Sequence, residues 1–332
     1  MSARDESDDT SLQFSRRLFL SSATGVGVLL TAFGLPAVAQ PAASQQAPAP
    51  QTGSRKRMIV DAQVHLWKPA TADRPWRPGA TPQLPEPFTV EKLLPIMNEA
   101  GVDRVVIVPP SWEGDRNDYA LEAVARHPDR FAIMGRIAIE KPDSAGLLPK
   151  WKEQPGMKGI RVSFNGTQAV WLTNGTADWF WPAAEKAGIP VMFLTNGQTP
   201  QFARIAERHP GLQLIIDHMG LTLEIAKERR IPAAISDSVA LARYPNVSVK
   251  LSSAPTYSFD PYPYRDMTES IKRLFDAFGP RRCFWGTDMT NSFAKAIYRQ
   301  RIEHFTQELS FLSEEDKDWI MGRAIATRLG IA

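Results

Sequence analysis

The stretch MIVDAQVHLW, residues 58–67, decides the fold, because it is a short β-branched and apolar run that ends in polar groups. A run of this length and composition is typical of a buried β-strand. The residues at its end, HLWKPAT, contain no glycine-rich phosphate loop, which a doubly wound nucleotide-binding sheet would carry at this place. An open, doubly wound sheet is therefore only the second choice of fold.

Seven similar runs follow along the chain, with helical patterns between them. They are DRVVIVPP (103–110), RFAIMGRIAI (130–139), MKGIRVSF (157–164), PVMFLT (190–195), LQLIIDH (212–218), NVSVKLSS (246–253) and RCFWGT (282–287). Intervening segments such as TVEKLLPIMNEAG end in glycine, which is favoured just after a helix. Two last helices are expected over residues 294–312 and 313–329. Eight strand–helix units over residues 58–332 predict an α/β fold, a single (β/α)8 TIM barrel.

The first 39 residues have the layout of an export signal. Residues 15–20 read SRRLFL, an apolar stretch follows, and Ala37-Val38-Ala39 is a small-x-small cleavage sequence. The paired Arg16-Arg17 resembles the twin-arginine signal of bacteria. We expect residues 1–39 to be a signal peptide read by the twin-arginine export machinery, with a periplasmic or secreted product; retention as an anchor is the alternative. Residues 40–57, rich in Ala, Pro and Gln, are expected to form a disordered linker.

The composition sets limits on function. The chain is 43% hydrophobic and 23% charged, as is usual for a globular protein. Its formal charge is only +3 and it has no basic run, which argues against binding of nucleic acid. Its single cysteine, Cys283, excludes an intrachain disulfide and a cysteine-based zinc site.

Polar side chains gather at the carboxyl ends of the expected strands, where barrel enzymes place their catalytic groups. They are Gln63, His65, Arg161, Ser163, Asn196, Asp217, His218, Lys250, Ser252 and Asp288. Asp61, Gln63 and His65 alternate along the first strand and are expected to share one face. The other histidines precede prolines or lie in a helical pattern, and are expected to be structural: His127, His209 and His304. His65, His218 and Asp288 are therefore the candidate centre.

Five motifs occur in a characteristic order: DAQVHLW, IRVSF, IIDHMG, VKLSS and WGTD. Together they resemble the amidohydrolase-2 group of the amidohydrolase superfamily, over about residues 58–330, and within it the pyrone-dicarboxylate lactonase and sugar-lactonase branch. His218 and Asp288 match the family's histidine on strand six and aspartate on strand eight. Two positions depart from the pattern: the His-x-His of strand one is Gln63-Val64-His65, and FLTNGQ stands where many members have a histidine after strand five.

The resemblance leaves the cofactor open. His65, His218 and Asp288 could supply the three protein ligands that a catalytic zinc usually has, so one divalent ion is one possibility. The missing first histidine weakens this site, and the lactonase branch includes enzymes that need no metal. Action without a metal is the other possibility.

The expected mechanism is attack of water on a carbonyl group. Asp288 would act as the general base, and His65 and His218 would polarise the carbonyl and stabilise the oxyanion. Arg161 would bind a substrate carboxylate through its guanidinium, or else close the barrel through an ion pair. Further substrate contacts are expected from Gln63, Asn196, Lys250 and Tyr257, although Lys250 could equally be the structural partner of a carboxylate. Tyr257 begins a loop over residues 255–266 that is expected to cover the site.

The function expected from these residues is hydrolysis of a lactone or related cyclic ester that carries a carboxylate. A metal-dependent decarboxylase of the same barrel family is the first alternative. A ligand-binding barrel without catalysis is the second. The loops that set specificity have little sequence meaning, so neither the substrate nor the oligomeric state follows from the sequence.

Overall fold

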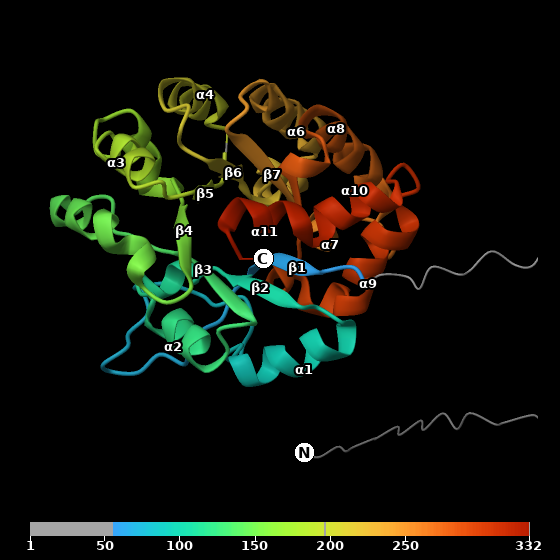
Figure 1. Ribbon diagram of the computed structural model, residues 1–332, viewed down its shortest axis with the longest axis horizontal. Coiled ribbons are helices and arrows are strands. Elements are labelled where there is room, and N and C mark those ends of the chain that lie inside the picture. The colour runs from blue at the N-terminus through green and yellow to red at the C-terminus, as the bar shows by residue number, and fades with distance from the viewer. Residues whose placement is uncertain (1–55, 196, 332) are drawn as a thin grey trace, which may run out of the picture. The chain divides into compact units, whose positions relative to one another are not determined.

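The computed structural model describes residues 56–195 and 197–331. In this part of the chain, eight parallel strands follow one another in sequence order around a barrel (Figure 1). They are β1 (Val60–Val64), β2 (Arg104–Ile107), β3 (Phe131–Gly135), β4 (Met157–Val162), β5 (Val191–Phe193), β6 (Leu214–Ile216), β7 (Val247–Ser252) and β8 (Cys283–Gly286). Beyond β8, the backbone N–H of Asp288 donates to the carbonyl oxygen of Gln63 over 2.9 Å, which brings the last strand beside the first. The (β/α)8 barrel is confirmed, while the expected export signal, residues 1–39, lies outside the described residues.

Helices surround the strands (Figure 1). The α-helices are α1 (Val90–Ala100), α2 (Asp118–Arg126), α3 (Phe180–Lys186), α4 (Thr199–Arg208), α5 (Leu223–Lys227), α6 (Ile231–Ala240), α7 (Ala254–Tyr257), α8 (Thr268–Phe278), α9 (Tyr298–Glu303), α10 (Glu314–Asp318) and α11 (Ala324–Leu329). The two expected terminal helices are present over residues 298–308 and 314–329, and each contains a π-helical turn, at His304–Glu308 and at Trp319–Arg323. In the described part of the chain, no helix is long and apolar enough to cross a membrane.

The end of the barrel at which the strands begin is filled with apolar side chains. Strand residues alternate, so that Val106 points into the barrel while Val105 and Ile107 pack against the helices outside. Residues of α11 join the inner cluster and close this end. Gly322, just before α11, permits the close approach, because a Cβ atom there would lie 2.4 Å from the carbonyl oxygen of Met58. Polar groups inside the barrel are therefore concentrated at its other, carboxyl end.

The expectation that Asp61 shares a face with Gln63 and His65 is wrong. The register between β1 and β2 shifts between Asp61 and Val64, which breaks the simple alternation along the strand. The Asp61 carboxylate accepts hydrogen bonds from Thr287 and, over 2.7 Å, from the hydroxyl of Tyr298 on α9. Asp61 thus links β1 to the end of β8 and to α9 by hydrogen bonds. Gln63 and His65, in contrast, both lie at the carboxyl end of the barrel.

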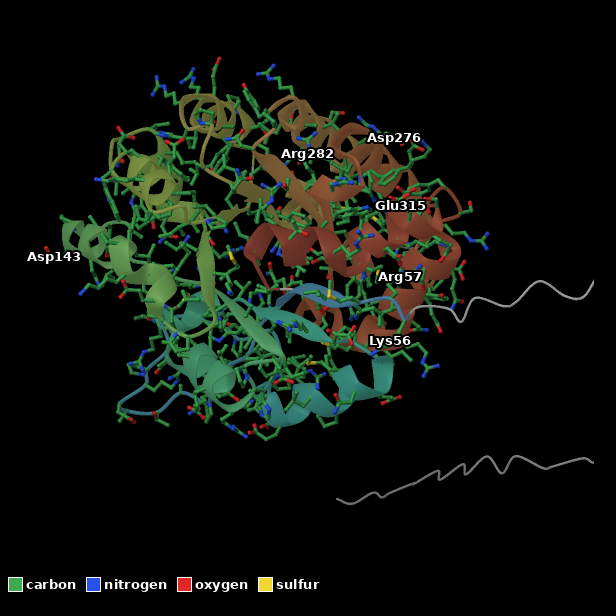
Figure 2. The ribbon with its side chains drawn as sticks, viewed as in Figure 1. Lys56, Arg57, Asp143, Asp276, Arg282 and Glu315 are labelled. Atoms are coloured by element: carbon green, nitrogen blue, oxygen red, sulfur yellow. The ribbon has the colours of Figure 1, made fainter. Side chains whose placement is uncertain are left out.

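The residues just before β1 are attached to the barrel surface (Figure 2). Lys56 forms an ion pair with Asp103 at 2.8 Å, and Arg57 pairs with Asp318 and Glu314, each at 2.7 Å. These two residues were assigned to the linker from the sequence. Exposed pairs of this kind contribute little each, on the order of 1 kcal/mol or less, so they position the start of β1 more than they stabilise the fold.

Candidate active site

A cavity of about 830 Å³ lies at the carboxyl ends of the strands. Among the residues that line it are His65, Arg77, Arg136, Arg161, Ser163, His218, Tyr257, Asp288 and Asn291. This volume is sufficient for a small-molecule substrate. The location is the one at which barrel enzymes carry out their chemistry.

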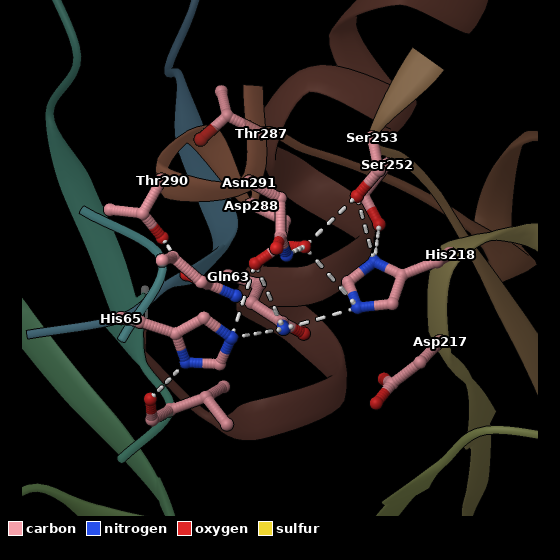
Figure 3. A network of polar contacts seen from close by, with 12 residues as sticks. Gln63, His65, Asp217, His218, Ser252, Ser253, Thr287, Asp288, Thr290 and Asn291 are labelled. Atoms are coloured by element: carbon pink, nitrogen blue, oxygen red, sulfur yellow. Dashed lines mark hydrogen bonds and ion pairs between the residues drawn. The ribbon is translucent and has the colours of Figure 1, made fainter. Parts of the chain in front are cut away.

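His65, His218 and Asp288 meet on the floor of this cavity (Figure 3). They lie within two residues of the ends of β1, β6 and β8. Nε2 of His65 lies 3.1 Å from Oδ1 of Asp288, and Nε2 of His218 lies 3.6 Å from Oδ2. All three side chains are buried, with 1% of Asp288 exposed. The structure therefore brings the three residues chosen from the sequence into one centre.

Left-handed backbone turns aim these side chains at the centre. His218 has a φ of 50°, Asp288 a φ of 44° and Ser253, at the end of β7, a φ of 68°. Non-glycine residues rarely adopt such angles, and strained positions of this kind cluster at functional sites. Three neighbouring strands thus end in the same unusual turn around one carboxylate.

The electrostatics keep Asp288 ionised and His218 neutral at pH 7. Burial alone would raise the pKa of Asp288, but its contacts with His218, His65 and Asn291 outweigh burial and hold that pKa below its ordinary value. Burial lowers the pKa of His218 to about 4, although Asp288 and Asp217 oppose the change. The centre therefore offers an anionic base beside a neutral imidazole.

The hydrogen bonds at Nδ1 indicate where the imidazole protons lie. Nδ1 of His65 donates to the carbonyl oxygen of Val108 over 2.6 Å. Nδ1 of His218 lies 2.9 Å from the hydroxyl oxygens of Ser252 and Ser253. Since Ser253 directs its own hydrogen to Asp288, its oxygen can accept the Nδ1 hydrogen of His218. In the neutral ring of His218, Nε2 then carries a lone pair that faces the centre, whereas Nε2 of His65 contacts Oδ1 of Asp288 at 3.1 Å.

The structure places Gln63 and Lys250 beneath the cavity floor, and neither lines the cavity. The amide nitrogen of Gln63 lies 3.2 Å from Nε2 of His65, 3.3 Å from Nε2 of His218 and 3.5 Å from Oδ1 of Asp288. Its amide oxygen accepts a hydrogen bond from Lys250. Figure 3 shows the carboxamide between the two imidazole rings.

Two buried ion pairs connect this centre to the cavity wall. Nζ of Lys250 lies 2.6 Å from Oδ1 of Asp217, and Nε of Arg161 lies 2.9 Å from the other oxygen, Oδ2. Burial would raise the pKa of Asp217, but Lys250 and Arg161 hold it below its ordinary value. Arg161 thus forms an ion pair, which was one expectation for it. It also lines the cavity, so its guanidinium is placed where the other expectation, binding of a substrate carboxylate, requires it.

Arg136 is a site residue that the sequence analysis missed. Its side chain is buried and lines the cavity, and its Nε donates to the carbonyl oxygen of Pro109 over 2.6 Å. Among residues 56–195 and 197–331, no carboxylate forms an ion pair with it. Burial, together with the charges of Arg161 and Arg77, shifts its pKa well below the ordinary value. In the sequence, the apolar run 130–139 is interpreted as one strand, and Arg136 is not recognised as a strand-end residue. In the structure β3 ends at Gly135, and Arg136 is the first residue after it.

The remaining expected contacts have different outcomes. Tyr257 lines the cavity, and its hydroxyl donates to the carbonyl oxygen of Leu221 over 2.9 Å. From the loop 255–266, only Thr256 and Tyr257 line the cavity, so most of that loop does not cover the site. Asn196 lies outside the described residues.

The side-chain arrangement does not fit a metal ion. Within the described ranges, no three His, Cys, Asp or Glu side chains are arranged as metal ligands. His65, His218 and Asp288 do face one point, but the amide nitrogen of Gln63 lies there, at distances of 3.2–3.5 Å. Zinc would need its nitrogen ligands at about 2.0–2.1 Å.

Comparison with known proteins adds a family and several relatives. The family model described as Amidohydrolase matches residues 60–329. An L-fucono-1,5-lactonase from Burkholderia ambifaria is 26% identical over 242 residues, which cover 69% of this chain and 79% of that protein. A 4-sulfomuconolactone hydrolase from Hydrogenophaga intermedia is 28% identical over 252 residues, 70% of this chain and 74% of that protein.

Solved structures share the fold. A Burkholderia multivorans amidohydrolase with bound zinc has a TM-score of 0.71 and 18% identity, over 83% of this chain and all 100% of that chain. A 5-carboxyvanillate decarboxylase from Sphingomonas paucimobilis has a TM-score of 0.59 and 13% identity, over 83% and 100% of the two chains. At these identities the likeness shows the fold alone.

Proposed function

The chain belongs to the Amidohydrolase family, and we propose that within it the protein opens a lactone that carries an anionic group. The expected family and the expected class, a hydrolase, are confirmed. The proposal of a lactone is supported by relatives whose names describe lactonases and lactone hydrolases. The observation that carries it is the ionised Asp288 carboxylate, buried between two imidazoles on the floor of a cavity that holds two buried arginines.

The proposed reaction uses Asp288 as the general base. Its carboxylate takes one proton from a water molecule while the water oxygen bonds to the lactone carbonyl carbon. The tetrahedral intermediate then collapses, the bond from carbon to the ring oxygen breaks, and the ring oxygen leaves as an alcohol with the proton from Asp288. A base whose pKa is held low returns this proton readily. The product is the open hydroxy acid.

The positive charge for the oxyanion comes from arginine in this proposal. The two histidines were expected to polarise the carbonyl, which requires a hydrogen on Nε2. In the neutral ring of His218, Nε2 carries a lone pair instead, so His218 can only accept a hydrogen from the attacking water, while His65 contacts Asp288 and positions its carboxylate. Arg136 and Arg161 line the cavity and supply the charge for the oxyanion and for an anionic substituent.

A panel of substrates tests this function. The purified protein should open carboxylated or sulfonated lactones, measured by acid release at constant pH, and it should release no CO2 from hydroxylated aromatic acids. Release of CO2 without opening of any lactone would support the decarboxylase alternative. Tight binding of these lactones with no turnover in either assay would support the barrel that only binds a ligand.

Export remains part of the proposal. The SRRLFL segment and the Ala37-Val38-Ala39 sequence support delivery to the periplasm by the twin-arginine route. That route carries folded proteins, and a compact barrel suits it.

A further inference from the structure

We propose that the carboxamide of Gln63, held by Lys250, serves this centre in place of a metal ion. In this role the amide hydrogens of Gln63 position both imidazoles and Asp288, and Lys250 supplies the buried positive charge. The inference concerns the centre of the proposed function and rests on that function for its activity readout only. It follows from the contacts of two side chains that the cavity does not expose.

The orientation of the Gln63 amide is fixed by its neighbour. A lysine ammonium group has donors and no acceptor. The atom of Gln63 that faces Lys250 must therefore be its oxygen, and the NH2 group must face the centre. One amide hydrogen is directed at Nε2 of the neutral His218, 3.3 Å away, and the other lies toward Nε2 of His65 and Oδ1 of Asp288, at 3.2 and 3.5 Å. Lys250 thus determines which group is presented to the histidines.

A metal ion at this point would have to displace the amide group. The contacts of Nζ of Lys250 within the described residues are the amide oxygen of Gln63, the carboxylate of Asp217 and, at 3.4 Å, the sulfur of Met192. If Gln63 turned its oxygen to a metal, its NH2 group would face the ammonium group, and two donors would meet. If Gln63 moved away, a fully buried ammonium group would lose an acceptor, which is costly.

The centre already holds at least as much positive charge as negative charge. Asp217 and Asp288 carry two negative charges, and Lys250 and Arg161 carry two positive ones. A divalent cation would add two positive charges without a new partner. Arg136, which also lines the cavity, has no carboxylate partner in the described part of the chain. Uncompensated buried charge is strongly unfavourable, so the centre discriminates against the ion electrostatically.

Gln63 controls Asp288 by its backbone as well. Its carbonyl oxygen accepts the backbone N–H of Asp288 over 2.9 Å, while its side-chain nitrogen lies 3.5 Å from Oδ1. One residue of β1 thereby sets both the turn and the carboxylate of the proposed base. Gln63 and Lys250 are positioning residues, because neither reaches the cavity.

The first experiment measures metal. Full-length protein is purified from zinc-supplemented cells, its metal content is determined by mass spectrometry, and zinc is titrated into chelator-treated protein by calorimetry. We expect well under one equivalent of metal and no zinc binding in the micromolar range. One tightly bound equivalent of zinc, with activity lost on chelation and restored by zinc, would overturn the proposal. Both metal readouts hold even if no lactone is turned over, so a failed substrate assay leaves this test intact.

The second experiment separates the two side chains. Gln63→His alone restores the imidazole but keeps the ammonium group beside it, so zinc binding should stay weak. Gln63→His with Lys250→Met should bind zinc at least tenfold more tightly than Gln63→His alone, in line with the usual weight of groups that support metal ligands. Equal zinc affinity in the two proteins would show that Lys250 does not exclude the metal.

Lys250→Met alone tests positioning. We expect kcat to fall by about tenfold or more with little change in KM, because the Gln63 amide is no longer oriented. Lys250→Arg, which keeps the charge, should recover part of the loss. The control is Lys186→Met, an exposed lysine on α3, which should behave as the wild type. If Lys250→Met does not fold, the wild-type metal content and titration still decide the question.

Discussion

Oδ1 of Asp288 lies 3.1 Å from Nε2 of His65. In the described chain, three further groups can donate hydrogen bonds to this carboxylate. They are the hydroxyl of Ser253 and the amides of Asn291 and Gln63. A neutral amide at position 288 would turn its own NH2 group toward one of these donors. The site is therefore built for a carboxylate, which gives the first prediction.

Asp288→Asn should lower kcat on a confirmed lactone by a factor on the order of 10² to 10⁴, because an amide cannot take the proton of the attacking water. KM should change little, since Arg136 and Arg161 still bind the anionic group. Steady-state kinetics measure both. Asp237→Asn, at an exposed position of α6, is the matched control and should have wild-type kinetics. Full activity in Asp288→Asn would refute the proposed base.

Arg136→Met should raise KM for a carboxylated lactone by roughly tenfold to a hundredfold, since a guanidinium that binds a carboxylate contributes on the order of 1.5–3 kcal/mol. KM for an uncharged lactone should stay the same, and comparison of the two substrates is the measurement. Because no carboxylate pairs with Arg136 in the described part of the chain, the variant strands no buried anion and loses only the hydrogen bond to the carbonyl oxygen of Pro109, so its melting temperature should fall by a few degrees at most. An equal rise in KM for both lactones would contradict an anion-binding role.

The barrel could be predicted because its signals are local. In β7 the residues alternate between Val247, Val249 and Leu251, which face the helices, and Ser248 and Lys250, which are buried on the other side. Such alternation can be read from a few consecutive residues. This signal does not locate the end of a strand when the apolar run is longer than the strand. For this reason the end of β3, and with it Arg136, was not predicted.

The centre could be predicted only in part. His65, His218 and Asp288 lie one or two residues beyond strands, and the barrel geometry brings strand ends together. The contact between Gln63 and Lys250 joins positions 187 residues apart and depends on the register shift in β1. No sequence periodicity encodes that shift, which is also why the face of Asp61 was predicted wrongly.

The export signal gives a prediction that needs no structure. Arg16→Lys with Arg17→Lys should leave the protein in the cytoplasm at its precursor mass, because the paired arginines are the feature that the export machinery recognises. Cell fractionation and mass spectrometry measure location and cleavage. Lys56→Met, outside the signal, is the control. Normal delivery of the double variant would rule out the twin-arginine route.

A buried asparagine gives a prediction for stability. The side-chain nitrogen of Asn246 donates to the carbonyl oxygens of Ala206, His209 and Leu212 over 3.0–3.1 Å, which ties the end of α4 to the start of β7. Asn246→Ala leaves these carbonyl groups without their donor, and the free energy of unfolding should fall by about 2–4 kcal/mol. Denaturant unfolding measures the change. Asn98→Ala, at an exposed position of α1 where only an exposed hydrogen bond from Arg130 is lost, should cost less than about 1 kcal/mol, and similar losses in both variants would refute the assignment.

The last prediction concerns His304, whose Nε2 has no hydrogen-bond partner in the described chain and whose ring packs against Tyr264 and Phe305. Burial lowers its pKa to about 4 from 6.5, while Asp266 opposes the change. Between these two values the unfolded chain binds more protons than the folded one, so the free energy of unfolding should fall as the pH is lowered through this window.

His304→Phe removes this titrating group but keeps an aromatic ring. The difference in unfolding free energy between wild type and His304→Phe, measured by denaturant at pH 7 and pH 4, should change by up to about 3 kcal/mol, with the wild type losing more. The comparison cancels every other titrating group, including Asp61 and Glu113, whose pKa values burial raises. A constant difference across this range would show that His304 takes up its proton as easily in the folded protein as in the unfolded chain.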